Sequence, residues 1–382
     1  MLNKLRSVAL VAALFLCSTS AKAVDITIAF VGQSLCAEMF SVSSSPPTPL
    51  SGTSMWANGS TSWTAVTGNG AIQYANRIKT ATGATNVRLY NACFGGSALL
   101  SADASPAANY WLNTASGAPL DLFYTMVSNS GVVPDLIEYN QGQQDYMSSL
   151  PNLLGDYEAG LGSLRSMILS HFGKTAAQLP WQQWVTGKAA YGQAGSTYVN
   201  AAQIRYGLSG AAGVALGPSY YDLTYVDGTH LNAASYQTNG DRGAVGALRL
   251  LGATGFTRPG SGPSITSAIR SSNLVLLGTN AASILGHRAP LYPKSPFNNT
   301  TNISGFTVWN SSYSSTIAVN AAQTIGDMVL LTLASDPGAG AHVGYQWDNA
   351  YNASNPIYDD NDPFSTGFGL PLTPLTIQVS TN

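Results

Sequence analysis

Short apolar segments alternate with segments of helical periodicity over the first two thirds of this 382-residue chain. Runs of apolar residues predict buried strands at residues 26–31, 87–92 and 135–139, and weaker runs predict strands at 181–185 and 214–216. Apolar residues spaced three and four apart, and a glycine stop at Gly83, predict helices at residues 71–82, 154–171 and 232–251. Strands that alternate with helices form a parallel sheet covered on both faces. The expected fold class is therefore α/β, a three-layer αβα sandwich.

The sequence changes character at the turn-rich segment Arg258-Pro259-Gly260-Ser261-Gly262-Pro263. Beyond it, short β-type runs are separated by Gly, Asn, Pro and Asp, at residues 274–277, 307–309, 316–319, 328–333, 343–347 and 375–379. This pattern predicts a small all-β accessory domain, a sandwich. We therefore expect an α/β domain at residues 24–257, a linker at 258–263 and a β-rich domain at 264–382.

The first 23 residues have the features of a secretory signal peptide. Lys4 and Arg6 precede an apolar run at residues 8–17, and Ala21-Lys22-Ala23 supplies a small-x-small cleavage site. No later apolar run approaches the ~20 residues that a membrane helix needs. We expect a secreted or periplasmic protein without a membrane span.

Few residues are charged, 9% of the chain, and the formal net charge is −2. This composition disfavours nucleic acid and anionic membrane as partners. The acidic run Asp359-Asp360-Asn361-Asp362 lacks the spacing of a calcium loop and is expected to be a solvated turn. No grouping of Cys and His suggests zinc. We therefore expect neither a metal site nor a cofactor.

A serine, an aspartate and a histidine lie at positions suited to nucleophilic catalysis. Gly32-Gln33-Ser34 directly follows the first predicted strand, and Asp227 precedes His230 by three residues, just before the last predicted helix. At this spacing Asp227 can accept a hydrogen bond from one imidazole nitrogen while the other nitrogen faces Ser34. The alternative is an Asx-turn beside a solvated histidine. The other histidines, His171, His287 and His342, are expected to be structural.

Two further segments would supply hydrogen-bond donors for an oxyanion. Gly95-Gly96 follows the second predicted strand, and Gln141-Gly142-Gln143-Gln144 follows the third, so both reach the same sheet edge as Ser34. Backbone N–H groups and amide side chains are typical oxyanion donors. A polar loop network is the alternative interpretation of the glutamines.

In this order, these segments resemble the four sequence blocks of the SGNH (GDSL-type) hydrolase superfamily. The matching positions are Ser34, Gly96, Gly142-Gln143-Gln144-Asp145 and Asp227-Gly228-Thr229-His230. The Gly-Gln-Ser form of the first block and Gln141-Gly142 are similar to the sialate O-acetylesterase and carbohydrate esterase branch. Leu35 and Gln144 depart from that pattern, because each stands where an asparagine is usual.

The resemblance implies a flavodoxin-like parallel sheet and an exported serine esterase that removes acetyl or other short acyl groups from carbohydrate. It implies Ser34, Asp227 and His230 as catalytic residues, Ser34, Gly96 and Gln144 as the oxyanion hole, and no cofactor. The expected partner is an acylated poly- or oligosaccharide. Lipase or arylesterase activity, glycan O-acetyltransfer and a degenerate glycan-binding protein remain alternatives.

Side chains beside the nucleophile are candidates for substrate binding. Gln33 precedes Ser34, and Trp56 and Trp63 lie in the long segment that follows it. Tryptophan rings stack on sugars, and packing of this segment onto the sheet is an equal alternative. Cys36 and Cys93 follow adjacent predicted strands at the same edge, which permits one disulfide in an exported protein. Two buried thiols are the alternative.

Overall fold

The computed structural model describes residues 24–187, 195–280, 292–293, 303–346, 357–359, 363–364 and 370–381. The predicted signal peptide at residues 1–23 and His287 lie outside the described residues. Within those residues, no helix combines the length and apolarity required to cross a membrane.

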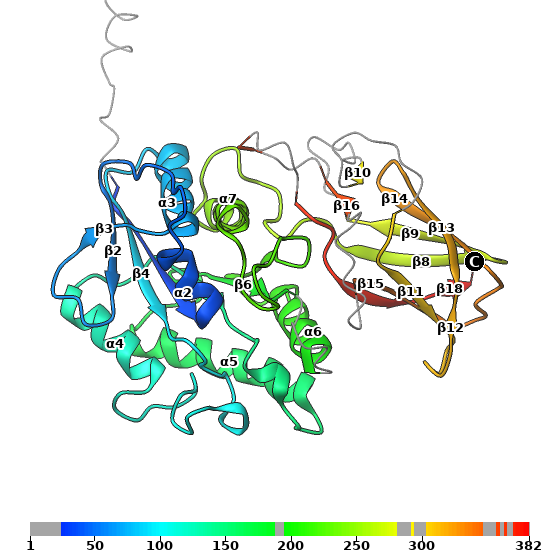
Figure 1. Cartoon of the computed structure of the whole chain (residues 1–382), viewed down its shortest axis with the longest axis horizontal. Coiled ribbons are helices and arrows are strands. Elements are labelled where there is room, and N and C mark those ends of the chain that lie inside the picture. The colour runs from blue at the N-terminus through cyan, green and yellow to red at the C-terminus, as the bar shows by residue number, and fades with distance from the viewer. Residues whose placement is uncertain are drawn as a thin grey trace, which may run out of the picture.

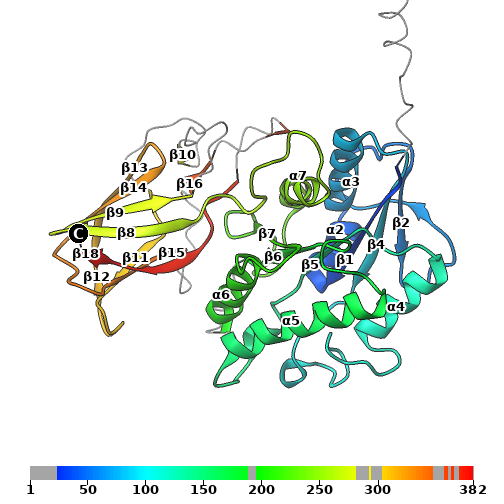
Figure 2. The same ribbon diagram turned by 180° about the vertical axis from the view of Figure 1, so that it is seen from behind.

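A seven-stranded sheet forms the centre of the α/β portion, in the order β3-β2-β4-β1-β5-β6-β7 (Figures 1 and 2). Its strands are β1 (Ile26–Gly32), β2 (Thr53–Ala57), β3 (Thr64–Ala65), β4 (Val87–Cys93), β5 (Leu136–Asn140), β6 (Trp181–Val185) and β7 (Val214–Ser219). All neighbouring strands run parallel except β2 and β3. The order β4-β1-β5-β6-β7 is the flavodoxin-like order, so the predicted fold class is confirmed.

Helices cover both faces of this sheet (Figure 1). One face packs against α2 (Ser34–Ser41), α3 (Asn69–Thr82) and α7 (Ala233–Leu250). The other packs against α4 (Pro119–Ser130), α5 (Leu153–His171) and α6 (Gly195–Gly207). Successive side chains of a strand point to opposite faces, so Ile28 and Phe30 enter the first core, whereas Ala29 and Val31 enter the second.

The predicted helices and strands of this portion occur within a few residues of their expected bounds. The α3 helix ends at Gly83, which adopts the left-handed conformation with φ 67° and donates its N–H to the Lys79 carbonyl. Five further helices and strands were not predicted: α2, β2, β3, α4 and α6. Two short 3-10 helices, η1 (Ser101–Asp103) and η2 (Asp145–Met147), lie in the loops after β4 and β5.

Two sheets form the core of the C-terminal portion, and their strands pair antiparallel except for β18, which runs parallel to β8 (Figure 2). One contains β11 (Phe306–Trp309), β12 (Thr316–Ile317), β15 (His342–Tyr345) and β17 (Leu375–Gln378). The other contains β8 (Ile265–Ser271), β9 (Leu274–Thr279), β13 (Val319–Ile325), β14 (Met328–Leu333) and β18 (Ser380–Thr381). A short pair, β10 (Tyr292–Pro293) and β16 (Ile357–Tyr358), lies beside them. Val308 and Val343 of one sheet share a core with Val275 and Val329 of the other, as in a sandwich.

The connection between the two portions is packed into the molecule. Ser261 and Arg258, within the segment expected as a linker, are buried, and Arg258 forms a 3.1 Å ion pair with Asp359. Asp359 also accepts from the Leu370 N–H and is 5% exposed, so the expected solvated turn is wrong at this residue. Residues 360–362 lie outside the described part.

Side chains of the α/β portion also enter the β-rich core. Tyr221, which follows β7, is buried among its residues and donates to the Leu372 carbonyl. Tyr358 donates to Asp222, which also pairs with Arg242 at 2.7 Å. The domain bounds given above remain a prediction.

Candidate active site

The turn after β1 places Ser34 at the carboxyl edge of the sheet. A Cβ on Gly32 would lie 2.0 Å from the Asn140 carbonyl oxygen, so only glycine fits where β1 passes β5. Gln33 then donates its N–H to the same carbonyl, and α2 begins at Ser34. The hydroxyl therefore emerges half-buried at the first residue of a helix, beside the ends of β1 and β5.

The side chains of Ser34, His230 and Asp227 meet at this edge. His230 Nε2 lies 3.2 Å from Ser34 Oγ, and His230 Nδ1 lies 2.9 Å from Asp227 Oδ2. Because a carboxylate is an acceptor, Nδ1 carries the proton and Nε2 is left to accept from the serine hydroxyl. The arrangement is that of a nucleophile, a base and a group that orients the base.

A tight turn holds the Asp227 carboxylate. Its Oδ1 accepts from the backbone N–H groups of Thr229 and His230, both at 2.7 Å. The hydrogen bond from the His230 ring, followed by these two backbone bonds, lowers the pKa of Asp227 to about 2. The carboxylate is therefore ionised throughout the neutral range. Asp227 therefore forms the Asx-turn that was the alternative interpretation, and His230 contacts Ser34 as well. The turn orients the imidazole toward the serine hydroxyl.

A second carboxylate near His230 was not predicted from the sequence. Glu38, one helical turn after Ser34, has Oε1 at 3.6 Å from His230 Nε2. Its Oε2 accepts from the Tyr236 hydroxyl at 2.7 Å. Ser34 and Glu38 are four residues apart, and this spacing places them on one helix face. The sequence would have indicated Glu38 only if α2 had been predicted.

The loop after β4 is tied to the end of β1. The Phe94 N–H and Ser97 Oγ both donate to the Gly32 carbonyl, at 2.9 and 3.2 Å. Gly96 adopts the left-handed conformation, with φ 67°, which glycine adopts at little cost. These contacts bring the predicted oxyanion glycine to the same edge as Ser34.

The loop after β5 is anchored by a buried carboxyl group. Asp145 accepts from the Leu99 and Leu100 N–H groups and from the Gln141 amide. Burial raises the pKa of Asp145 to about 7, against the effect of these hydrogen bonds. Gln144 donates its side-chain amide to the Asp103 carbonyl at 3.0 Å. The loops after β4 and β5 therefore form one polar network.

Gln33 belongs to this network and is almost completely covered by it. It is 2% exposed, and its amide hydrogen-bonds to Gln143 and accepts from the Gln144 N–H. With its amide oxygen and nitrogen exchanged, it donates to the Ser97 carbonyl and accepts from the Gln143 N–H, both at 3.0 Å. The expected role in substrate binding is corrected: Gln33 links the nucleophile turn to the neighbouring loops.

Both tryptophans of the segment after Ser34 pack within the protein. Trp56 lies on β2, is 4% exposed and contacts Trp63 edge-on, with ring centroids 5.4 Å apart. Trp63 packs on Tyr90, with centroids 5.1 Å apart, and Arg88 lies over its ring. Trp56 pairs with Tyr90, which lies three residues before the end of β4. At the rise of a strand, this position is about 10 Å from the carboxyl end of β4. The stacking expectation is corrected for the buried Trp56, and the packing alternative describes both rings.

A disulfide joins Cys36 to Cys93, with the two Cα atoms 5.5 Å apart. It connects the first turn of α2 to the end of β4. The other described histidines stack on tyrosines, His171 on Tyr124 and His342 on Tyr313. These contacts agree with their expected structural role.

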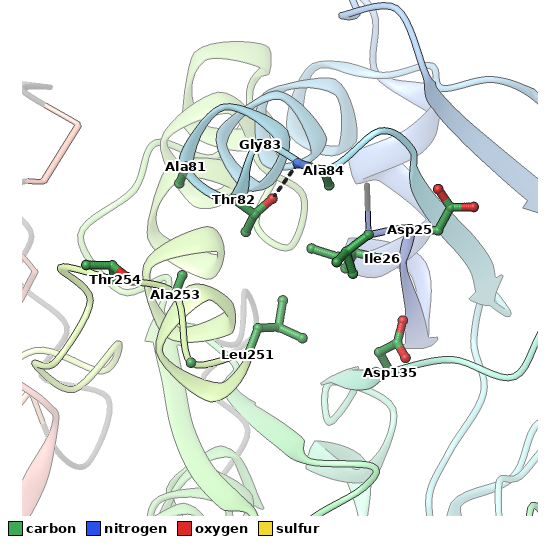
Figure 3. A pocket seen from close by; sticks show the side chains of 12 residues that line it. Asp25, Ile26, Ala81, Thr82, Gly83, Ala84, Asp135, Leu251, Ala253 and Thr254 are labelled. Carbon is green, nitrogen blue, oxygen red and sulfur yellow. Dashed lines mark hydrogen bonds between the residues drawn. The ribbon is translucent and has the colours of Figure 1, made fainter. Parts of the chain in front are cut away.

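Two features elsewhere in the α/β portion are separate from this edge. Glu138 on β5 is fully buried and accepts from Tyr74 and Trp184; burial raises its pKa to about 8. A hollow of about 520 Å³ opens at the amino ends of the strands, around Ile26, Asp135 and Leu251 (Figure 3). The carboxylate of Asp135 accepts there from the Thr27 N–H, so it holds the start of β1.

No protein-family model and no curated protein matches the chain. Among solved structures, the chain is similar to a carbohydrate acetylesterase from Xanthomonas citri, with 15% identity and a TM-score of 0.66. That match covers 92% of this chain and 80% of the other, so it extends into the β-rich portion. A family two carbohydrate esterase from Clostridium thermocellum has 17% identity and a TM-score of 0.36, over 59% and 65% of the two chains. The likeness to the Xanthomonas citri structure shows a shared fold, and the expected SGNH-hydrolase-type fold is confirmed at that level.

Proposed function

We propose that this protein is an exported serine esterase that removes acetyl or other short acyl groups from carbohydrate. One observation carries the proposal: Ser34 Oγ, His230 and Asp227 form a continuous hydrogen-bonded series, with contacts of 3.2 and 2.9 Å. A hydroxyl in such a series is activated for attack on an ester carbonyl.

The reaction proceeds through an acyl-enzyme. Ser34 Oγ attacks the carbonyl carbon as its proton passes to His230 Nε2. The ester C–O bond then breaks, and the imidazolium returns that proton to the departing sugar oxygen. Water attacks the acyl-enzyme with His230 as the base, which releases the carboxylic acid and restores Ser34. Asp227 holds the imidazole tautomer throughout and stabilises the imidazolium.

The oxyanion hole is assigned to the N–H groups of Ser34 and Gly96 and to the Gln144 amide. A glutamine amide has two N–H bonds, and Asp103 takes one, which leaves the other for the oxyanion. The Asp103 bond also holds the side chain in place before substrate arrives. Donors that are fixed in advance stabilise a developing charge most effectively.

The substrate class and the location rest on other support. The solved structure with the TM-score of 0.66 is described as a carbohydrate acetylesterase. The chain has few charged residues, which suits neutral, hydroxyl-rich substrates. A disulfide persists in oxidising compartments, so the Cys36–Cys93 bridge supports export.

Acetate release from a panel of acetylated glycans tests this function. Wild type should release acetate, whereas Ser34→Ala should lose several orders of magnitude in kcat and keep its thermal stability. Labelling by a fluorophosphonate checks whether Ser34 is nucleophilic, and a p-nitrophenyl ester series measures acyl-chain preference. The carbohydrate assignment would be refuted if Ser34 labels but the unlabelled enzyme prefers long acyl chains and releases no acetate from any glycan.

A further inference from the structure

We infer that Glu38 is a further positioning residue of this site: a second carboxylate that, with Asp227, stabilises the His230 imidazolium. The inference rests on the proposed esterase function and deepens it. It starts from one distance, 3.6 Å between Glu38 Oε1 and His230 Nε2. This is ion-pair range, whereas Ser34 Oγ holds the hydrogen-bonding position on the same nitrogen at 3.2 Å.

The Glu38 carboxylate has a fixed position. Glu38 lies on α2 four residues after Ser34, so both side chains project from the same face of that helix. Its other oxygen accepts from the hydroxyl of Tyr236, a fully buried residue of α7. Burial, followed by the neighbouring Glu38, raises the pKa of Tyr236, so the phenol remains a donor at every working pH. A carboxylate held in this way needs little reorganisation when charge develops beside it.

The two carboxylates have different surroundings. Asp227 has 57% of its side chain exposed and is held by its own turn, whereas Glu38 is 27% exposed. A less exposed charge is less screened by water and salt. The groups that face the imidazole are Asp227 from its own turn, and Ser34 and Glu38 from α2. Tyr236 stands behind Glu38.

Glu38 acts when His230 becomes positively charged. An imidazole that accepts a proton from serine is uncharged before the transfer, and a carboxylate 3.6 Å away from it gains little. Once Nε2 accepts the serine proton, the imidazolium lies between two negative charges, one beside each ring nitrogen. The interaction is stronger in the transition state than in the ground state, so its loss is expected in kcat and not in KM.

Glu38→Gln tests this role with little change of shape, because the amide oxygen still accepts from Tyr236. We expect kcat to fall about tenfold at unchanged KM. The acidic limb of the pH–activity profile should move down by about one pH unit, because a tenfold change and one pH unit are the same free energy. Tyr236→Phe frees the carboxylate but keeps its charge, and should give a smaller loss in kcat. Glu158→Gln on α5, whose carboxylate pairs with Arg205, is the matched control and should leave both measurements unchanged.

The outcomes separate this inference from the proposed function. Wild-type kcat and an unmoved acidic limb in Glu38→Gln would overturn the role of Glu38 while Ser34 still labels with a fluorophosphonate. If kcat and thermal stability both fall in Glu38→Gln while the acidic limb stays in place, Glu38 is merely structural. That result would also overturn the inference. Failure of wild type to label or to hydrolyse esters would instead refute the esterase itself.

Discussion

Breaking the Cys36–Cys93 disulfide should destabilise the α/β portion strongly. The bridge spans 57 residues of chain, from α2 to the end of β4. The chain-entropy relation for a loop of that length gives about 4 kcal/mol of stabilisation, because the bridge restricts the unfolded chain. A domain of 150–250 residues changes its Tm by ~2–4 °C per kcal/mol. We therefore expect the Tm of the α/β portion to fall by about 8–16 °C.

Thermal unfolding followed by calorimetry, with and without reductant, measures this effect. The double variant Cys36→Ala/Cys93→Ala should unfold near the temperature of the reduced wild type. Reductant should leave the double variant unchanged, which separates the bridge from other effects of the reagent. Activity should fall as well, because the bridge joins the helix that begins at Ser34 to the strand that leads to the Gly96 loop.

Two results would refute this reasoning. The unreduced protein can be unfolded and then alkylated. If this finds two free thiols, the bridge is excluded. A reduced protein whose Tm lies within ~2 °C of the oxidised one would show that the loop is already restricted in the unfolded chain.

Three further predictions concern an oxyanion donor, the turn that carries Ser34 and a buried carboxyl group of the core. Gln144→Ala should lower kcat by a factor of about 10²–10³ if its amide is the oxyanion donor, as measured by steady-state kinetics. If Gln144→Ala has nearly wild-type kcat while Gln143→Ala has lost most of its activity, the donor is Gln143. Gly32→Ala should cost on the order of 1–3 kcal/mol and most of the activity, because the new Cβ would lie 2.0 Å from the Asn140 carbonyl; unchanged Tm and kcat would contradict this. The native pKa of Glu138, about 8, lies above its ordinary 4.5, so this carboxyl contributes stability below pH 4.5 that is lost as pH rises toward 8. The free energy of unfolding of Glu138→Gln should therefore rise relative to that of wild type by up to about 3 kcal/mol between pH 5 and 8. A difference between the two proteins that does not change with pH would contradict this prediction.

The sequence alone predicted the elements whose local pattern is strong. Strand β1 is a continuous apolar run because both of its faces are buried, and α5 shows a long amphipathic stripe. Helix α2 was missed because it has only eight residues, of which four are buried, and no side chain caps it. Strand β2 was missed because its five residues have the pattern of a loop, and only pairing with β4 and β3 makes them a strand.

The same distinction applies to the candidate site. Ser34, Asp227 and His230 were proposed from the sequence because their chain order and the three-residue spacing of the last two are themselves a pattern. Glu38 was not, since its relation to His230 spans most of the domain and exists only once α2 packs beside α7.

Burial also separates what the sequence determined from what tertiary structure decided. Gln33 and Trp56 have side chains that suit substrate binding, yet both are covered, because their strands and turns face other parts of the protein. Residue type and spacing set which chemistry a chain can perform. Which side chains reach the substrate is decided only by packing, because that depends on contacts between segments far apart in the chain.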